Sequence, residues 1–141
     1  MGEKVVLDTN ILISSVGWKG NPEKIFEEII KGTIELIISY GQFDEISRVL
    51  EYSKFDFTKE QKSRLKNLIL EIATFVSPKE KITTIKEDCE DNLILESAIA
   101  GKADYIVSGD EHLLKLRNFR DIKILNARQF VEELKIRRGY W

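Results

Sequence analysis

The chain has 141 residues, of which 43% are hydrophobic and 33% charged, with only two prolines and eight glycines. This composition is typical of a folded globular domain and excludes a disordered or fibrous chain. The net charge of −2 at pH 7 excludes a strongly basic protein, so any affinity for nucleic acid must come from a local feature of the fold.

The first half of the sequence alternates apolar strands with amphipathic helices. Val5–Leu7 is predicted to be a buried strand that turns at Asp8-Thr9-Asn10 into a helix carrying Ile11–Ile13. The pattern then predicts a loop at Trp18–Asn21, a helix over Pro22–Lys31 ended by Gly32, a strand over Ile34–Ser39, a helix over Gln42–Glu51 and a long helix over Thr58–Val76. The least regular stretch is Ser77–Glu90.

The second half repeats this alternation with shorter elements. Asp91–Ala100 is apolar on nearly all sides, which predicts a buried helix that ends at Gly101. The pattern then predicts a strand over Tyr105–Ser108, a short helix containing Leu113, Leu114 and Leu116, a strand over Ile122–Leu125 and a helix over Ala127–Lys135. This order indicates an α/β fold with a mostly parallel sheet. We expect a single domain over 1–141 with flexible ends at 1–3 and 136–141.

Two aspartates directly follow predicted strands. Asp8 comes after the first strand and Asp110 after the Tyr105–Ser108 strand. Open parallel sheets bind their ligands outside the carboxyl ends of the strands, so both side chains are candidates for a site there. Taken singly, each is equally well explained as an ordinary turn or helix-capping residue.

Two further acids are placed by helical geometry. On the Gln42–Glu51 helix, Glu45 flanks the apolar side, whereas Asp44 points toward solvent. On the Asp91–Ala100 helix, the carboxylate of Asp91 points inward from the first turn, and Glu90 is a weaker alternative. By themselves, Glu45 is more simply a solvated helix acid and Asp91 a cap.

A convergence of four carboxylates requires a cation, because without one the acids repel one another and take up protons. Carboxylate oxygens with no histidine cluster suit Mg²⁺ or Mn²⁺ better than zinc. Nearby polar residues would then orient waters or phosphate oxygens, and the candidates are Thr9, Asn10, Asn92 and Ser108.

These acids carry a family resemblance. Asp8 in VVLDTN, Glu45 in DEISRVL, Asp91 in CEDNLILESAIAGKADYIVSGD and Asp110 in SGDEHLL together resemble the four acidic positions of PIN domains. The resemblance covers about Val5 to Phe130 and is closest to the PIN ribonuclease toxins of toxin–antitoxin systems. It implies a three-layer α/β/α fold and a Mg²⁺- or Mn²⁺-dependent endoribonuclease in which the four acids are catalytic and bind metal. It also implies an RNA substrate, a homodimer and a protein antitoxin.

One position departs from the family pattern. PIN domains commonly carry a second aspartate two residues after the position of Asp110, and this chain has His112 there. That departure is expected to weaken a second metal position. We predict His112 to be a surface residue rather than a ligand, and Cys89 to be a small packing residue rather than a nucleophile, because no base lies near it.

Several alternatives stay open at this point. The first is a PIN-like RNA- or protein-binding module with little catalytic activity, for which His112 is the motivating departure. A phosphoacceptor receiver domain fits less well, because Thr9 and Asn10 stand where it needs an acid after its first strand. No motif distinguishes RNA from single-stranded DNA. Weak candidates for substrate contact are Trp18, Lys19 and Lys24 near the first turn and the tail KIRRGYW.

The chain is expected to be cytoplasmic and not to enter a membrane. No apolar run approaches the roughly 18 residues of a membrane span, and the start MGEKVVLDTN lacks the apolar stretch of a signal peptide. The single cysteine also excludes an internal disulfide.

Overall fold

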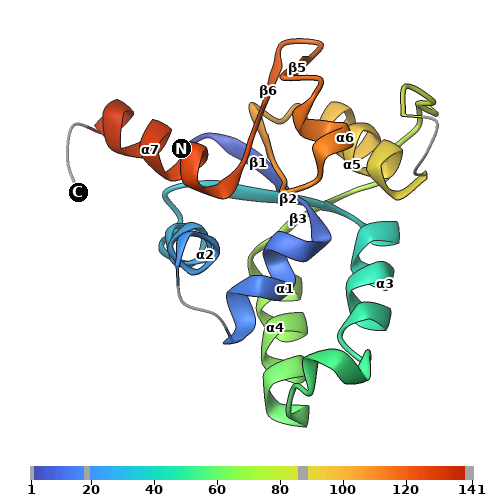
Figure 1. The fold of residues 1–141 in the computed structure, drawn as a ribbon, viewed down its shortest axis with the longest axis vertical. Coiled ribbons are helices and arrows are strands. Elements are labelled where there is room, and N and C mark those ends of the chain that lie inside the picture. Colours follow the sequence, from blue (N-terminus) through green and yellow to red (C-terminus); the bar gives the residue numbers. More distant parts are fainter. Residues whose placement is uncertain (1, 18–19, 86–88, 139–141) are drawn as a thin grey trace.

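The computed structural model describes residues 2–17, 20–85 and 89–138, and it contains a six-stranded sheet with helices on both faces (Figure 1). The strands are β1 (Lys4–Leu7), β2 (Glu35–Ser39), β3 (Thr74–Val76), β4 (Tyr105–Val107), β5 (Asn118–Phe119) and β6 (Ile122–Leu125). The α-helices are α1 (Thr9–Gly17), α2 (Asn21–Lys31), α3 (Tyr40–Val49), α4 (Lys59–Ile72), α5 (Cys89–Ala100), α6 (Glu111–Leu114) and α7 (Ala127–Arg138), and η1 (Ser53–Phe55) is a 3₁₀ turn.

The three-layer α/β/α arrangement follows from the alternation of side chains along the strands. On β1, Val5 and Leu7 join a core cluster that includes residues of α1, α2, α3, α4 and α7. Val6, between them, points to the opposite face and packs with residues of α5 and α6. Since both faces are covered, the central strands are continuously apolar, as parallel sheets require. The predicted fold class is therefore confirmed.

The strand order places a reversal at the middle of the sheet. The order is β3-β2-β1-β4-β6-β5, and every pair is parallel except β5 with β6. The chain thus builds outward from β1 through β2 to β3 and then returns to the other side of β1 with β4. The carboxyl ends of β1 and β4 flank this reversal, which is where such sheets bind ligands. The backbone N–H of Asp8 donates to Val107 O at 2.9 Å and ties the two ends together.

The predicted long helix over Thr58–Val76 is wrong at its C-terminal end. Helix α4 stops at Ile72, and Ala73 takes an extended conformation with φ −81° and ψ 150°. Residues Thr74–Val76 form β3 and pair with β2. Two of the three are β-branched, which favours a strand, and pairing with β2 outweighed the helical spacing of the apolar residues.

A second strand was also missed at β5, which pairs antiparallel with β6. The two-residue turn between them is Arg120-Asp121, and both residues have positive φ, at 48° and 71°. Such turns are recognised in a sequence by glycine or asparagine, and neither is present here. The turn signal was therefore absent from the sequence.

Other boundaries differ from the prediction by a few residues. Helix α3 begins at Tyr40 rather than Gln42, because the Ser39 side chain accepts the Gln42 N–H at 3.0 Å and caps the helix. Helix α5 begins at Cys89 rather than Asp91, so Asp91 lies inside the first turn and is not its cap.

Some predicted residues lie outside the described part of the chain, namely the substrate-contact candidates Trp18 and Lys19 and the tail residues 139–141. Among the described helices, none combines the length and apolarity needed to cross a membrane.

Candidate metal centre

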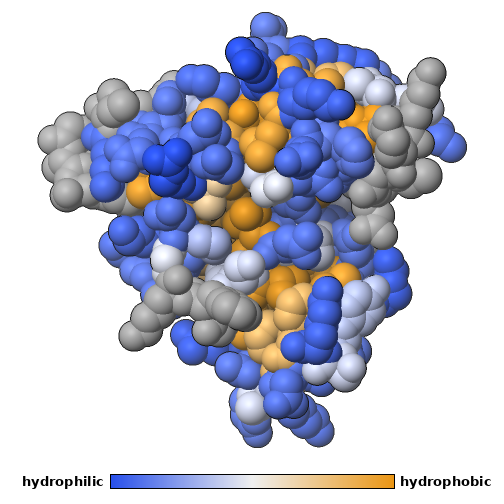
Figure 2. All heavy atoms as spheres, in the orientation of Figure 1, coloured by the Kyte–Doolittle hydropathy of each residue, from blue (hydrophilic) through white to orange (hydrophobic). Residues whose placement is uncertain are grey.

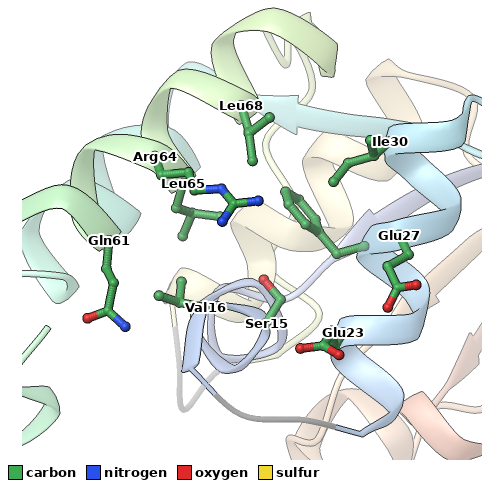
Figure 3. Close-up of a pocket in the computed structure, with 10 residues that line it drawn as sticks. Ser15, Val16, Glu23, Glu27, Ile30, Gln61, Arg64, Leu65 and Leu68 are labelled. Atoms are coloured by element: carbon green, nitrogen blue, oxygen red, sulfur yellow. The ribbon is translucent and has the colours of Figure 1, made fainter. Parts of the chain in front are cut away.

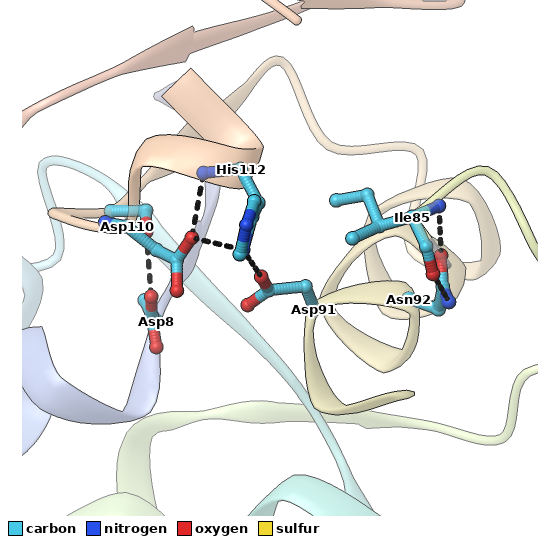
Figure 4. A network of polar contacts seen from close by, with 7 residues as sticks. Asp8, Ile85, Asp91, Asn92, Asp110 and His112 are labelled. Carbon is cyan, nitrogen blue, oxygen red and sulfur yellow. Dashed lines mark hydrogen bonds and ion pairs between the residues drawn. The ribbon is translucent and has the colours of Figure 1, made fainter. Parts of the chain in front are cut away.

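Four carboxylates from four different parts of the chain line one pocket. Asp8 follows β1, Glu45 lies on α3, Asp91 on α5, and Asp110 precedes α6. The pocket has a volume of about 220 Å³, and all four residues contribute to its wall. Asp8, Asp91 and Asp110 surround a common space in Figure 4. The structure thus brings together the four acids that the sequence singled out, whereas the solvent-facing prediction for Asp44 agrees with its exposed position.

Ser108 forms hydrogen bonds with both of the aspartates that follow strands, Asp8 and Asp110. The Ser108 hydroxyl donates to Asp8 Oδ2 at 2.6 Å and accepts the backbone N–H of Asp110 at 2.9 Å. Asp110 in turn caps α6, since its Oδ1 accepts the His112 N–H at 2.7 Å. Ser108 therefore fixes the relative positions of both carboxylates. Its role in orienting waters or phosphate oxygens stays a prediction.

Burial raises the pKa of Asp8 above its usual range. The hydrogen bond from Ser108 opposes this effect, and the negative charge of Asp110 adds to it. Asp8 is thus held in a position that disfavours its own ionised form. A cation between Asp8 and Asp110 would reverse both unfavourable contributions, because it would replace lost hydration and screen the repulsion.

Asp91 and His112 lie on the other side of Asp110 from Asp8 (Figure 4). Asp91 is 4% exposed, and its Oδ2 lies 3.9 Å from His112 Nδ1. The same nitrogen lies 3.4 Å from Asp110 Oδ1 (Figure 4). Each of the three residues offers a ligand atom, and these atoms lie within 4.8 Å of one another. The His112 side chain is 43% exposed, which agrees with the predicted surface position, but its ring also faces both aspartates, so it is a candidate ligand that the sequence analysis had set aside.

Glu45 is held by neighbours on two other elements. It is 7% exposed, and one of its carboxylate oxygens, Oε1, accepts the Thr9 hydroxyl. One turn earlier on α3, the buried side chain of Gln42 donates to Leu7 O at 2.6 Å. Helix α3 is thereby fastened to the end of β1, directly before Asp8. Thr9 also lines the pocket, and its role in orienting waters or phosphate oxygens stays a prediction.

The two predicted asparagines behave differently. Asn10 lines the pocket, and its backbone N–H donates to Asp8 Oδ1 at 3.4 Å. Asn92 does not join the group. Its Oδ1 accepts the Ile85 N–H at 2.9 Å, and its Nδ2 donates to Ile85 O, so both amide atoms hold the segment before α5 (Figure 4). The predicted role of Asn92 in orienting water or phosphate is replaced by this structural one.

The pocket also has a wall that the sequence analysis missed. The acids share this wall with Arg48 on α3, with Tyr52 directly before η1, and with Lys54 and Phe55 on η1. One signal was available, since Arg48 follows Glu45 by three residues and so lies on the same side of α3. The approach of Tyr52 and Lys54 depends on the turn after α3, which the pattern did not predict.

The donor set fits a hard divalent ion. The available atoms are carboxylate oxygens with one imidazole nitrogen, and Mg²⁺ and Mn²⁺ take carboxylates and water. The ligand atoms of Asp91, Asp110 and His112 lie within 4.8 Å of one another, close enough for one ion to contact all three. No thiol competes for the site among the residues that line it.

Removal of the Asp8 charge should stabilise the protein when no metal is bound. We expect Asp8→Asn to raise the thermal midpoint in EDTA by roughly 2–4 °C, about 1 kcal/mol, because the amide oxygen keeps the Ser108 bond without the desolvated charge. Differential scanning calorimetry measures this. Mn²⁺ should stabilise the parent but not the variant. A lower midpoint in EDTA would show that the Asp8 charge stabilises the fold and would contradict the argument.

A larger cavity lies away from the acids. It has a volume of about 390 Å³ and lies between α1, α2 and α4 (Figure 3). Apolar side chains also gather over the lower half of the face in Figure 2, where Figure 1 places α1 and α4. The cavity is lined by Ser15, Val16, Glu23, Phe26, Glu27, Ile30, Gln61, Arg64, Leu65 and Leu68. None of the four acids of the metal centre contributes to it, and we assign it no chemical role.

Comparison with known proteins agrees with the fold of the chain. A family model described as PIN domain matches residues 4–112, a span that contains all four acids and His112. A structure of VapBC2 from Rickettsia felis, bound to a DNA fragment from its promoter, matches with a TM-score of 0.59 at 19% identity, over 87% of this chain and 98% of that chain. VapBC-1 from nontypeable Haemophilus influenzae matches with a TM-score of 0.57 at 19% identity, over 89% and 98%. Among curated proteins, no match was found.

Proposed function

Because the chain belongs to the PIN-domain family, we propose that it is a metal-dependent endoribonuclease whose site is formed by Asp8, Glu45, Asp91 and Asp110. One observation carries the proposal: four acids from separate elements meet in one pocket at the carboxyl edge of the sheet. A capping role needs one acid for each helix and gives no reason for several to meet. Binding of a cation does give such a reason, because several carboxylate oxygens can coordinate one divalent ion.

In this proposal, the four acids hold Mg²⁺ or Mn²⁺, with His112 as an additional donor beside Asp91 and Asp110. A bound ion supplies an acidified water and positive charge for the phosphate oxygens. Ser108 holds Asp8 and Asp110, and Thr9 holds Glu45, so the carboxylates keep their positions when substrate enters. Hydrolysis adds water across a phosphodiester, and the bond from phosphorus to the leaving 3′ oxygen breaks.

The test is cleavage of a fluorescently labelled single-stranded RNA by the purified protein. We expect internal cuts with Mn²⁺ or Mg²⁺ and none with EDTA, because the substrate phosphate has no counter-charge without the ion. Calorimetry with Mn²⁺ runs in parallel. Metal binding without cleavage of any RNA or single-stranded DNA would favour the alternative, a PIN-like RNA- or protein-binding module. Absence of both would refute the nuclease.

We further propose that the protein is the toxin of a toxin–antitoxin pair, that it acts on cytoplasmic RNA and that it forms a homodimer. The family resemblance supports these proposals, and the similar structures are of VapBC proteins. Coexpression with the product of an adjacent reading frame tests the pairing, with light scattering for the assembly. A monomeric mass, or full cleavage in the presence of every adjacent product, would count against the corresponding proposal.

A further inference from the structure

We propose that Arg48, Tyr52 and Lys54 form a binding rim for single-stranded RNA beside the acids. In this assignment, Arg48 and Lys54 bind phosphates next to the one that is cut, and Tyr52 stacks on an unpaired base. The proposal rests on the nuclease function proposed above and names the residues that receive its substrate.

The first support is the position of the two cations. Arg48 and Lys54 line the same pocket as the four acids, and they are its only cationic side chains among the lining residues that the structure describes. Arg48 lies one turn beyond Glu45 on α3, at a Cβ separation of about 5–6 Å. In a chain with a net charge of −2, two cations at the mouth of the acidic pocket give it the local attraction for phosphates that the total charge lacks.

The second support is that neither cation forms a salt bridge within the part of the chain that the structure describes. Within residues 2–17, 20–85 and 89–138, no salt bridge involves Arg48 or Lys54, and both side chains are exposed. Arg48 in the last turn of α3 also suits the negative end of that helix, which is its plain structural role. That role accounts for Arg48 alone. It does not explain why Lys54 and Tyr52 line the same pocket.

The third support is the exposed ring of Tyr52. It is 51% exposed at the wall of a largely polar pocket, where an aromatic side chain gains little from burial. Such a ring offers a flat surface to a base that is not paired with another base. The following turn is held in place, since Phe55 stacks on Phe57 at 5.4 Å and Lys54 Nζ lies 5.1 Å from the Phe55 ring centroid. The rim residues Tyr52 and Lys54 therefore lie on a turn that is held in place by its own packing contacts beside the four acids.

The main test uses Arg48→Ala/Lys54→Ala against a control, Lys59→Ala/Arg64→Ala, which removes the same charges from exposed positions on α4. Affinity for a labelled single-stranded RNA is measured by fluorescence anisotropy in Ca²⁺ at several salt concentrations. We expect the rim variant to bind about tenfold or more weakly at 50 mM salt, with a salt slope smaller by about 1.4, because two phosphate contacts are lost. The control should bind like the parent.

The stacking contact has its own pair of variants. Tyr52→Ala should weaken binding about 5- to 100-fold, whereas Tyr52→Phe should bind like the parent, because stacking needs the ring and not the hydroxyl. Duplex RNA of the same sequence should gain nothing from Tyr52. Equal loss in both variants, or an equal effect on duplex RNA, would overturn the stacking assignment.

These outcomes separate the rim from the nuclease. If the parent cuts RNA and the rim variant binds and cuts equally well with an unchanged salt slope, the rim is refuted and the nuclease stands. If the parent binds Mn²⁺ but cuts nothing, the nuclease fails, and the binding experiment in Ca²⁺ still decides the rim. Calorimetry with Mn²⁺ should show no loss of affinity in the rim variant, since the variant leaves the four acids intact and removes only positive charge from their surroundings.

Discussion

Replacement of Asp91 by asparagine is expected to lower the rate of RNA cleavage about 100-fold or more. Asp91 is 4% exposed and faces Asp110 across His112 Nδ1, which lies 3.9 and 3.4 Å from their oxygens. Asparagine has nearly the same shape but no charge, so it keeps the packing and loses affinity for the ion. The rate is measured with a labelled RNA and saturating Mn²⁺.

The matched control is Asp44→Asn, the same chemical change at an exposed position one residue before Glu45. We expect this control to cut like the parent. Calorimetry should show a lower affinity for Mn²⁺ in Asp91→Asn and an unchanged affinity in Asp44→Asn. If Asp91→Asn cuts as fast as the parent, the activity comes from a contaminant or the site is elsewhere.

The four acids were predictable because each is placed by a local rule. Asp8 and Asp110 follow buried strands, and the carboxyl ends of neighbouring parallel strands meet at one edge of a sheet. Glu45 and Asp91 are placed by helical periodicity, which tells the inward side of a helix from the outward one. None of these rules needs the tertiary structure. The roles of the four acids in binding metal and in catalysis remain predictions.

The features that the sequence did not indicate depend on contacts outside a single helix or strand. His112 lies on the four-residue helix α6, too short for periodicity to indicate which way its ring points. Asn92 is adjacent to Asp91, but its amide is taken by the backbone of Ile85, seven residues earlier. Tyr52 and Lys54 reach the pocket through the turn after α3. A pattern of apolar and polar residues does not show which side chains of one segment come close to another segment in the fold.

The strands β3 and β5 were not predicted because they also depend on contacts with other parts of the chain. Thr74–Val76 continues the apolar spacing of α4 and becomes a strand because the edge of β2 is available to pair with it. Propensity is a weak guide where tertiary pairing decides. Both missed strands lie at the edges of the sheet, away from β1 and β4, so the site was predictable although the sheet was incompletely predicted.

The matched family span ends at residue 112, and α7 lies beyond it, so the contribution of this helix to stability needs its own test. Phe130 on α7 is 0% exposed and packs edge-on against Tyr105 of β4, with ring centroids 5.1 Å apart. We expect Phe130→Ala to lower the free energy of unfolding by about 3–5 kcal/mol, because it empties space in the main core cluster. Since domains are commonly stable by only about 5–15 kcal/mol, this is a large fraction of the total.

Urea denaturation followed by circular dichroism measures this loss, and the transition should stay single if α7 unfolds together with the sheet. Leu70→Ala is the control, because Leu70 is 57% exposed and its truncation should change the stability by no more than about 0.5 kcal/mol. Phe130→Leu should be intermediate, since it retains much of the buried volume. A loss below about 1 kcal/mol for Phe130→Ala, or a separate early transition, would show that α7 is not part of the cooperative core. In that case the sheet and the four acids beside β1 and β4 would keep their arrangement without it.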